Sequence, residues 1–323
     1  MSENAPVVRW GLIGCGDIAV KRVAAALRNA PGSHLVAVSR RQADRALEFA
    51  RRFGAERWHA SWEDLVRSDV DAVYIATPVD LHARMAIAAA EAGKHVLCEK
   101  PMALDVGECD RMVRAAEKSG VKLGVAYYRR FYPVLRRLKE LLAEGAIGAP
   151  VLVQADAFEA FDPGPEHPRR WFVDKSQSGG GPMFDFGCHR LEVFVNLFGL
   201  ATEIRGLTAQ VALARSVEDT AVAVLRFENG PVATLRVTHA TSLPKDVLEI
   251  HGRTGSIHIP RLNGPDLLIR ANGNEVLERH PPFENLHQPL VDQFVRAVLE
   301  DEAPEVDGRV GLEVNRILAA VYG

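Results

Sequence analysis

The sequence has few cysteines, no excess of charge of one sign and no long apolar run. Cysteine accounts for 4 of the 323 residues, at positions 15, 98, 109 and 188, and no two form a C-x-x-C pair. This spacing argues against a zinc knuckle and against a disulfide framework. The formal net charge of −3 argues against nucleic acid as a partner. The local basic cluster of Arg129-Arg130 with Arg136-Arg137 fits a solvated helix face.

Apolar segments are all short. None approaches the roughly 20 consecutive apolar residues that cross a bilayer, so we expect no membrane span. The N-terminus, MSENAPVVRWG, lacks a charged segment followed by a long apolar stretch, and no signal peptide is expected. These features predict a cytoplasmic protein. The hydrophobic share of 47% over 323 residues suffices for two cores rather than one.

Short apolar runs alternate with amphipathic segments over the first 125 residues. The apolar runs predict strands at Val7–Ile13, His34–Ser39, Ala72–Ala76, His95–Cys98 and Lys122–Ala126. Helical patterns lie between them at Asp17–Asn29, Gln42–Phe53, Asp80–Ala92 and Gly107–Ser119. Asp105 stands at an N-cap position, and Gly93 and Gly120 stand at C′ positions. The alternation predicts an α/β fold with a doubly wound parallel sheet and helices on both faces.

The pattern changes after about residue 126. A helix at Pro133–Ala143 precedes a different region that begins with Val151–Phe158, and Glu203–Leu277 has the pattern of strands in series. Helices at Pro289–Glu300 and Arg309–Tyr322 end the chain. We therefore predict a dinucleotide-binding domain over 1–125 and a substrate-binding and oligomerisation domain over 126–323. The second domain is expected to be α+β around a mostly antiparallel open sheet, whose exposed face would favour a homodimer or homotetramer.

The first predicted strand leads directly into Gly14-Cys15-Gly16-Asp17-Ile18-Ala19, the pattern G-x-G-x-x-A. Gly14 allows a tight turn, Gly16 lets the backbone approach a pyrophosphate, and Ala19 lets helix and strand pack closely. The following helix N-terminus, with Asp17 and Ile18, suits an anion. Because a strand precedes and a helix follows, the pattern predicts a dinucleotide-binding site.

The residues at the end of the second predicted strand indicate whether NAD or NADP is the preferred dinucleotide. An acidic residue here would accept hydrogen bonds from a ribose 2′-hydroxyl and repel a 2′-phosphate. The chain has Ser39, Arg40 and Arg41 instead, a hydroxyl donor and two guanidinium groups. This set favours NADP over NAD. Two other interpretations stay open: the arginines begin an exposed helix, or Arg40 stacks on the adenine of either cofactor.

Lys100 follows the predicted strand His95–Cys98 within the segment AGKHVLCEKP. Ligands of open α/β sheets bind beyond the carboxyl ends of the strands, so Lys100 is directed at the expected active site. A charged lysine there is costly unless it has a partner or a task. Taken alone, Glu-Lys-Pro would be an ordinary turn.

A second constellation lies downstream, in the segment GGGPMFDFGCH at 179–189. The three glycines would let the backbone pass close to a ligand. Asp185 and His189 are four residues apart, so on a helix they share a face. A histidine beside a carboxylate is a general acid/base pair. Two other interpretations of these residues stay open. In one, Asp185 caps a helix and His189 is a core residue. In the other, Asp185, His189 and Glu192 bind a metal ion, although we predict no metal.

This ordered set of motifs resembles the Gfo/Idh/MocA family of oxidoreductases. The resemblance rests on the glycine loop, on Ala76-Thr77-Pro78 with His82, and on the segments at 92–101 and 179–189, and it covers nearly the whole chain. It implies an N-terminal Rossmann domain and a C-terminal α/β domain whose open sheet often packs against another subunit. It also implies oxidation or reduction of sugars, cyclitols and related alcohols with NAD or NADP.

Site residues follow from the same resemblance. It implies catalytic roles for Lys100, Asp185 and His189, and a cofactor lining that includes Ala76, Thr77, Pro78, His82, Glu99, Lys100 and Arg129. It places the substrate against Lys100, Tyr127, Arg170, Trp171, Asp185 and His189. Two segments depart from the family. Trp171 is followed by Phe172 where many members have arginine, so that Arg169 or Arg170 would substitute, and Tyr127–Phe131 matches the basic-aromatic segment in outline only.

Hydride transfer between an alcohol carbon and a nicotinamide also moves the hydroxyl proton. We predict that His189 takes this proton in oxidation and returns it in reduction, and that Lys100 donates a hydrogen bond to the reacting oxygen. Asp185 would orient the imidazole or a substrate hydroxyl and balance the lysine's charge. The alternatives are a non-catalytic NAD(P)- or sugar-sensing protein and a methyltransferase that binds S-adenosylmethionine at the glycine loop.

Overall fold

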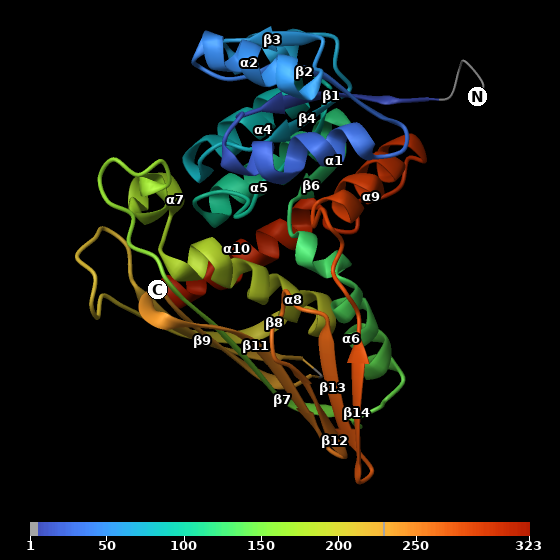
Figure 1. Cartoon of the computed structure of the whole chain (residues 1–323), viewed down its shortest axis with the longest axis vertical. Helices are drawn as coiled ribbons and strands as arrows, with labels where there is room; N and C mark the ends of the chain where they lie inside the picture. The colour runs from blue at the N-terminus through green and yellow to red at the C-terminus, as the bar shows by residue number, and fades with distance from the viewer. Residues whose placement is uncertain (1–5, 229) are drawn as a thin grey trace. The chain divides into compact units, whose positions relative to one another are not determined.

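The computed structural model describes residues 6–228 and 230–323, which form two compact units (Figure 1). The first unit runs to Tyr128 and takes up Asn285–Leu312; the second comprises Arg129–Glu284 and Glu313–Gly323. The segment Asn285–Leu312, which the sequence division gave to the second domain, thus has its contacts in the first unit. Residues 1–5, the beginning of the segment in which no signal peptide was expected, lie outside the described residues.

The first unit contains a six-stranded parallel sheet in the order β3-β2-β1-β4-β5-β6. The strands are β1 (Val8–Ile13), β2 (Ser33–Ser39), β3 (Arg57–His59), β4 (Ala72–Ile75), β5 (His95–Cys98) and β6 (Leu123–Val125). The helices are α1 (Ala24–Asn29), α2 (Ala43–Phe53), α3 (Trp62–Arg67), α4 (His82–Glu91), α5 (Val106–Ser119) and α9 (Gln288–Leu299). This strand order is that of the doubly wound dinucleotide-binding fold, with its topological switch between β1 and β4. The predicted parallel sheet is confirmed.

Local signals place the ends of several helices in this unit. The Asp105 side chain accepts a hydrogen bond from the Glu108 amide at 2.7 Å, which makes it the N-cap of α5. Gly120 ends the same helix with φ +66°, in the left-handed region that glycine adopts at low cost. The cap predictions at Asp105 and Gly120 are confirmed, and Gly93, with φ +74°, follows the last capping residue of α4 as predicted. The short strand β3 and the short helix α3 were not predicted.

Helix α9 completes the core of the first unit although it lies late in the sequence. The ring of Phe294 on α9 packs 5.6 Å from that of Trp10 on β1, centroid to centroid. A Cβ on Gly124 of β6 would lie 2.8 Å from the Phe294 ring, so glycine is needed for this close approach. The helical pattern of α9 was predicted, but a pattern of apolar residues does not say which core they enter.

The second unit contains an eight-stranded sheet in the order β14-β13-β12-β11-β7-β10-β9-β8. The strands are β7 (Pro150–Ala160), β8 (Ala201–Ala209), β9 (Thr220–Phe227), β10 (Val232–Thr238), β11 (Ala240–Gly252), β12 (Gly255–Ile259), β13 (Asp266–Ala271) and β14 (Asn274–Arg279). Neighbouring strands are antiparallel except for the parallel pair β7 and β10. The prediction of a mostly antiparallel sheet is confirmed.

Burial alternates along the central strands of this sheet. In β10, Ala233, Leu235 and Val237 are buried, whereas Val232 and Arg236 are exposed. Figure 1 shows α8 (Cys188–Phe198) along one face of the sheet, near α6 (Pro133–Ala143). The second unit also holds α7 (Lys175–Ser178), and α10 (Gly308–Tyr322) ends the chain. Among the described residues, no helix has the length and apolar character of a bilayer span.

Candidate active site

The glycine loop has the geometry that a dinucleotide requires. Gly14 follows β1 with φ +93°, and a Cβ on it would lie 2.6 Å from the carbonyl oxygen of Ala76, beyond the end of β4. Gly16 is exposed, and a Cβ there would meet nothing within 4 Å. Asp17 is exposed and pairs with Lys21 at 2.9 Å, while Ala19 is fully buried. The loop is therefore tight at its first glycine and open at its second.

The helix after the loop differs from the prediction of one α-helix over Asp17–Asn29. Asp17 and Ile18 are α-helical, Ala19–Val23 form a π-helical turn, and the helix then continues as α1. Ile18, at the start of this turn, is half-buried. π-Turns inside helices occur frequently at functional sites. Residue periodicity does not reveal such a turn, because it inserts a single residue into an otherwise helical pattern.

The end of β2 contacts the glycine loop. Gly14 donates its amide to the Ser39 carbonyl at 3.0 Å, and Arg40 Nη1 donates to the Cys15 carbonyl at 2.8 Å. Ser39 is buried, Arg40 is half-buried and Arg41 is exposed. Burial raises the pKa of the Cys15 thiol to about 12, so this cysteine stays protonated and unreactive. The Ser39 carbonyl and the Arg40 side chain thus join the end of β2 to the glycine loop.

His82 connects the turns that follow β4 and β5. Its Nε2 lies 2.9 Å from the Thr77 carbonyl oxygen and its Nδ1 lies 3.0 Å from the Pro101 carbonyl oxygen. The side chain is almost fully buried, and burial lowers its pKa. Ala76 is buried while Thr77 and Pro78 are half-buried. His82 therefore holds the Thr77 turn against the turn that carries Lys100.

Glu99 anchors the turn before Lys100. Its Oε1 accepts hydrogen bonds from the Tyr74 hydroxyl at 2.8 Å and from His287 Nε2 at 3.3 Å, and its Oε2 accepts from the Lys100 amide at 3.3 Å. Burial raises the pKa of Glu99, but the His287 contact and the other polar neighbours lower it below its usual value. The carboxylate is therefore ionised. Lys100 itself is half-buried, and its bond to Pro101 is cis.

Tyr127 and Arg129 follow β6, the next strand of the sheet. Tyr127 is fully buried and Arg129 nearly so. Between them, the ring of Tyr128 packs on that of His287, with centroids 4.4 Å apart, and the Arg22 guanidinium lies 5.6 Å from the Tyr128 ring. Residues after β1, β2, β4, β5 and β6 thus meet at the carboxyl edge of one parallel sheet.

The three glycines at 179–181 were predicted to let the backbone pass close to a ligand. The structure gives them another role, which is close packing within the second unit. A Cβ on Gly180 would lie 2.4 Å from the Tyr322 hydroxyl, and one on Gly181 would lie 2.1 Å from the Glu218 carbonyl oxygen. The Glu218 carboxylate also accepts hydrogen bonds from the Gly181 amide at 2.8 Å and from the Met183 amide at 3.3 Å. These contacts show that the glycines allow close packing within the protein, and ligand approach is not needed to explain them.

Asp185 and His189 lie on two consecutive helical segments. Asp185 belongs to a π-helical turn at Met183–Gly187, and His189 lies in the first turn of α8. The Asp185 side chain is 10% exposed and His189 is 2% exposed. Glu192 is fully buried and accepts a hydrogen bond from Arg130 Nε at 2.7 Å. Among the described residues, Asp185, His189 and Glu192 do not form a group whose possible ligand atoms all lie within 4.8 Å of one another, as the alternative metal site would require.

The structure instead brings Asp185 together with Glu159 and His239. One ligand-type atom of each lies within 4.8 Å of the others. His239 Nε2 is 3.6 Å from Glu159 Oε1 and 3.7 Å from Asp185 Oδ2, and His239 is buried. Burial raises the pKa of Glu159, and the charge of Asp185 raises it further. Asp185 therefore faces a second carboxylate and an imidazole that no motif had indicated.

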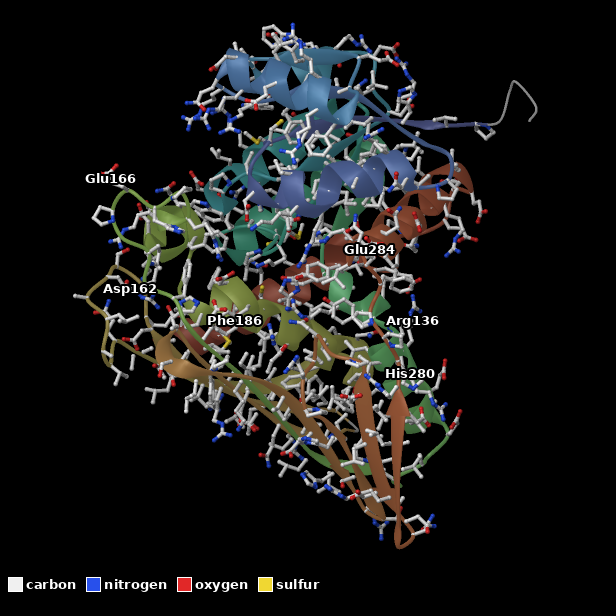
Figure 2. The ribbon with its side chains drawn as sticks, in the orientation of Figure 1. Arg136, Asp162, Glu166, Phe186, His280 and Glu284 are labelled. Carbon is white, nitrogen blue, oxygen red and sulfur yellow. The ribbon has the colours of Figure 1, made fainter. Side chains whose placement is uncertain are left out.

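His239 is held from its other side by Arg215, which is also buried. Arg215 Nη2 lies 2.9 Å from His239 Nδ1, while the same guanidinium donates to the carbonyl oxygens of Phe161 at 2.9 Å and Glu218 at 2.8 Å. The rings of Phe161 and Phe186, the latter labelled in Figure 2, flank the imidazole edge-on with centroids 5.1 Å away. The imidazole is thus fixed by one cation and two aromatic rings.

The loop after β7 contains the predicted Arg170 and Trp171. Figure 2 shows Asp162 and Glu166 on this loop. Arg170 Nη1 donates to the Pro163 carbonyl at 2.8 Å, and the Trp171 ring packs 3.9 Å from that of Phe172. The Arg169 guanidinium lies 4.5 Å from the Phe161 ring and 4.7 Å from the Phe172 ring. Arg170 therefore shapes the loop, and Phe172 provides a face for Arg169.

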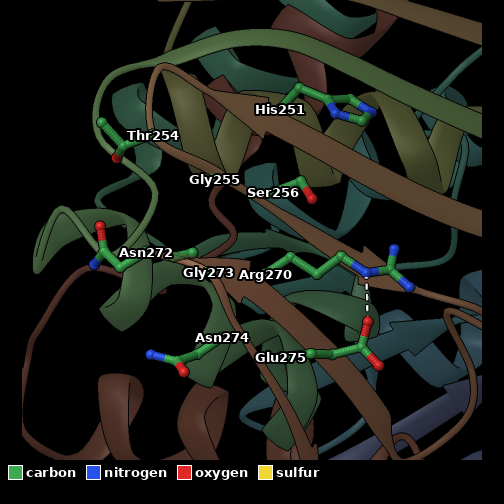
Figure 3. A pocket seen from close by; sticks show the side chains of 10 residues that line it. His251, Thr254, Gly255, Ser256, Arg270, Asn272, Gly273, Asn274 and Glu275 are labelled. Atoms are coloured by element: carbon green, nitrogen blue, oxygen red, sulfur yellow. Dashed lines mark hydrogen bonds and ion pairs between the residues drawn. The ribbon is translucent and has the colours of Figure 1, made fainter.

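Two hollows of the second unit lie elsewhere. One, of about 560 Å³, lies over β12, β13 and β14 and contains the ion pair of Arg270 and Glu275 at 2.6 Å (Figure 3). The other, of about 830 Å³, extends from Lys139 on α6 to Arg316 on α10. The described residues that line them include none of the predicted site residues.

Comparisons with known proteins decide the family. The profile described as the oxidoreductase family with an NAD-binding Rossmann fold matches residues 8–127, and that of the GFO/IDH/MocA C-terminal domain matches residues 135–258. The chain belongs to the Gfo/Idh/MocA family of oxidoreductases. The family resemblance, the α/β fold class and the assignment as an enzyme are thereby confirmed.

Individual relatives agree over nearly the full length of the chain. A 1,5-anhydro-D-fructose reductase of Ensifer adhaerens is 32% identical over 94% of this chain and 92% of its own. A D-xylose 1-dehydrogenase (NADP(+)) of Haloferax volcanii is 30% identical over 97% of this chain and 96% of its own. A levoglucosan dehydrogenase solved with NADH and levoglucosan has a TM-score of 0.88 and 26% identity, covering 98% of this chain and 96% of its own.

Several polar residues that the structure places in these contacts were not predicted from the sequence. They are Glu159, Arg215, Glu218 and His239 in the second unit and His287 in the first. Each lies outside the motifs and has at least one partner that is distant in the sequence. His239 directly follows the alternating strand β10, and this position in the sequence is a signal that could have drawn attention to it.

Proposed function

We propose that this chain is an NAD(P)-dependent dehydrogenase or reductase that acts on CH–OH groups. It transfers hydride between nicotinamide and a sugar, cyclitol or related polyol or ketone. The observation that supports this most directly is the convergence of Gly14, Ser39, Thr77 and Lys100 at the carboxyl edge of one parallel sheet. This is the edge at which open α/β sheets bind their ligands.

The residues of the first unit fit a dinucleotide. Gly16 leaves open space for a pyrophosphate, since a Cβ there would meet nothing within 4 Å. Asp17 and Ile18 lie at the adjoining helix start, and Ala76, Thr77, Pro78, His82 and Glu99 shape the neighbouring turns. When bound, the cofactor supplies or accepts the hydride, and the protein orients it. Arg129, which follows β6 in the sequence, is assigned to the same lining.

We assign NADP as the preferred cofactor. Ser39 and Arg40 lie beside the glycine loop, and the exposed Arg41 adds a second guanidinium. These groups suit a 2′-phosphate better than a bare ribose. The relatives include both a named NADP(+) enzyme and one solved with NADH, so the comparison leaves both cofactors open.

The proton transfer is assigned to His189. In oxidation its imidazole accepts the hydroxyl proton of the substrate, and in reduction it returns that proton. Lys100 donates a hydrogen bond to the reacting oxygen and stabilises the developing alkoxide charge. Asp185 orients the imidazole or a substrate hydroxyl and balances the charge of the lysine. Tyr127, Arg170 and Trp171 are assigned to substrate binding.

A sugar or polyol is the proposed substrate class. Trp171 packs on Phe172, and Asp185 with Glu159 offers carboxylate acceptors for hydroxyl groups. The three relatives are named for 1,5-anhydro-D-fructose, D-xylose and levoglucosan, which all carry several hydroxyl groups.

We also propose that the chain forms a homodimer or homotetramer through the uncovered face of the eight-stranded sheet. Val151, Val224 and Val232 on this sheet are 40–55% exposed, although valine is usually buried. Light scattering coupled to size-exclusion chromatography gives the mass. A monomer at micromolar concentration contradicts this assignment.

The activity is tested by following NAD(P)H absorbance across a panel of sugars, cyclitols and their ketones. We expect turnover with at least one of them. Binding of NADPH without turnover of any would indicate a sensor, and binding of S-adenosylmethionine in place of NADPH would indicate a methyltransferase.

The catalytic residues are tested in two variants. Lys100→Met and His189→Ala should bind NADPH nearly normally and turn over at least about a hundredfold more slowly, as expected for loss of a catalytic proton donor or acceptor. Lys122→Met is a matched control, because Lys122 pairs with Asp301 at 2.7 Å and precedes β6, at the end of that strand away from the predicted site. Turnover like that of the wild type in either test variant would remove the assigned role.

A further inference from the structure

The contacts of His239 determine which of its ring nitrogens carries the proton. Arg215 Nη2 lies 2.9 Å from Nδ1, and a guanidinium nitrogen is always a donor. Nδ1 must therefore be the acceptor, and a neutral imidazole with an unprotonated Nδ1 carries its hydrogen on Nε2. This nitrogen lies 3.6 Å from the carboxylate of Glu159 and 3.7 Å from that of Asp185.

The Nε2–H group has no hydrogen bond within 3.5 Å among the described residues, although the side chain is fully buried. A buried N–H donor without a partner is costly. Small movements of either carboxylate would complete a hydrogen bond. Phe161 and Phe186 flank the ring, so few water molecules compete for the donor.

The same proton argues against a metal in this cluster. Coordination through Nε2 requires a lone pair on that nitrogen, which would move the hydrogen to Nδ1 and set it against the N–H of Arg215. Arg215 is itself fixed by the carbonyl oxygens of Phe161 and Glu218. The three side chains have the spacing of a metal site but the wrong tautomer for one.

We propose that Arg215 and His239 form a positioning pair that holds the Asp185 carboxylate in its working orientation. Arg215 fixes the tautomer and the ring, and the Nε2–H of His239 attracts Asp185. Glu159 is the competing acceptor for this N–H group. The cations Arg169 and Arg190 favour the ionised form of Glu159. The inference rests on the proposed function, because the orientation of Asp185 matters only if Asp185 serves catalysis. Arg215 and His239, which lie in none of the sequence motifs, thereby receive a role in the reaction.

The kinetic test uses His239→Phe, which keeps a ring between Phe161 and Phe186 but removes both nitrogens. We expect kcat/KM to fall about 10- to 100-fold, the cost of a misplaced catalytic group, with the Kd for NADPH unchanged. His239→Gln, which can present an N–H near the Nε2 position, should recover most of this loss. His34→Phe is the control, since the exposed His34 lies at the start of β2, where its Nε2 is 3.3 Å from Glu56 Oε1. It should leave kcat/KM unchanged.

A double-mutant cycle separates positioning from structural support. In an Asp185→Ala background, His239→Phe should change kcat/KM by less than about twofold, because the carboxylate that it positions is gone. An undiminished loss in that background would overturn the proposal. So would a loss in His239→Phe that accompanies a fall in Tm and is not recovered by His239→Gln.

Long-range ¹H–¹⁵N spectra of histidine-labelled protein provide a readout that needs no substrate. We expect His239 to have an unprotonated Nδ1 and a protonated Nε2, unchanged by an excess of Zn²⁺. Protonation at Nδ1, or a Zn²⁺-induced loss of the Nε2 proton, would overturn the inference. If no polyol is turned over but this tautomer is found, the proposed function fails while the Arg215–His239 contact stands. If turnover is found with the other tautomer, only the positioning proposal fails.

Discussion

Replacing Gly14 with alanine should destabilise the first unit, whereas the same replacement at Gly16 should weaken cofactor binding and leave stability unchanged. Both residues belong to one glycine loop, but the structure gives them different surroundings. Gly14 has φ +93° and its Cβ would lie 2.6 Å from the backbone oxygen of Ala76. At Gly16 the Cβ would meet nothing within 4 Å.

The expected loss of stability in Gly14→Ala is the sum of a backbone cost and a steric cost. A left-handed backbone costs an L-residue roughly 1–2 kcal/mol, and an added methyl group that displaces neighbouring atoms costs roughly 1–3 kcal/mol. Together they predict a loss of about 2–5 kcal/mol for Gly14→Ala. For a unit of this size, 1 kcal/mol corresponds to about 2–4 °C in Tm, so Tm should fall by about 5–15 °C.

Scanning calorimetry and NADPH titration of both variants test the reasoning. Gly16→Ala should keep Tm within about 2 °C of the wild type and raise the Kd for NADPH at least about tenfold, or 1.4 kcal/mol. The reasoning is refuted if Gly14→Ala melts like the wild type. It is equally refuted if Gly16→Ala binds NADPH as tightly as the wild type.

Three further expectations concern the first unit. Arg41→Glu should raise the Kd for NADPH at least about tenfold while changing that for NADH little, and equal effects on both would argue against a 2′-phosphate site. Because burial lowers the pKa of His82, its neutral form is favoured in the folded state, and the unfolding free energy should fall as pH drops below about 6.5. Chemical denaturation at pH 7.5 and 5.5 should show a smaller fall for His82→Gln than for the wild type; an equal fall would assign the effect to other groups. Asp105→Ala should lose about 1 kcal/mol of stability with unchanged kcat, because it removes the N-cap of α5 and nothing at the site.

Much of the fold was predictable because local patterns determined it. The strand His95–Cys98 and the helix Pro133–Ala143 were predicted with the bounds that the structure has. Strand β3 was missed because its residues, Arg57, Trp58 and His59, form no apolar run, and helix α3 was missed because six residues are too few for a period to be recognised. The return of α9 to the first unit depends on Phe294 meeting Trp10, a contact between residues nearly 300 positions apart in the sequence.

The positions of candidate site residues were predictable from the sequence where these residues lie at the carboxyl end of a predicted strand. Gly14 follows β1, Ser39 is the last residue of β2 and Lys100 follows β5, so the order of the sheet alone brings them to one edge. The glycines at 179–181 were assigned to ligand approach because the sequence does not show that Tyr322 and Glu218 pack against them. The contact of Asp185 with His239 was also out of reach, since it depends on where the π-helical turn places Asp185 against the end of β10.

The most direct measurement of the central claim is a crystal structure of the chain with NADPH or NADH and a polyol that it turns over. The account predicts that Lys100 Nζ and a ring nitrogen of His189 both lie within about 3 Å of the reacting oxygen, with Asp185 in contact with the imidazole or with a neighbouring hydroxyl. A bound polyol whose reacting oxygen is out of hydrogen-bond reach of either Lys100 or His189 would contradict it.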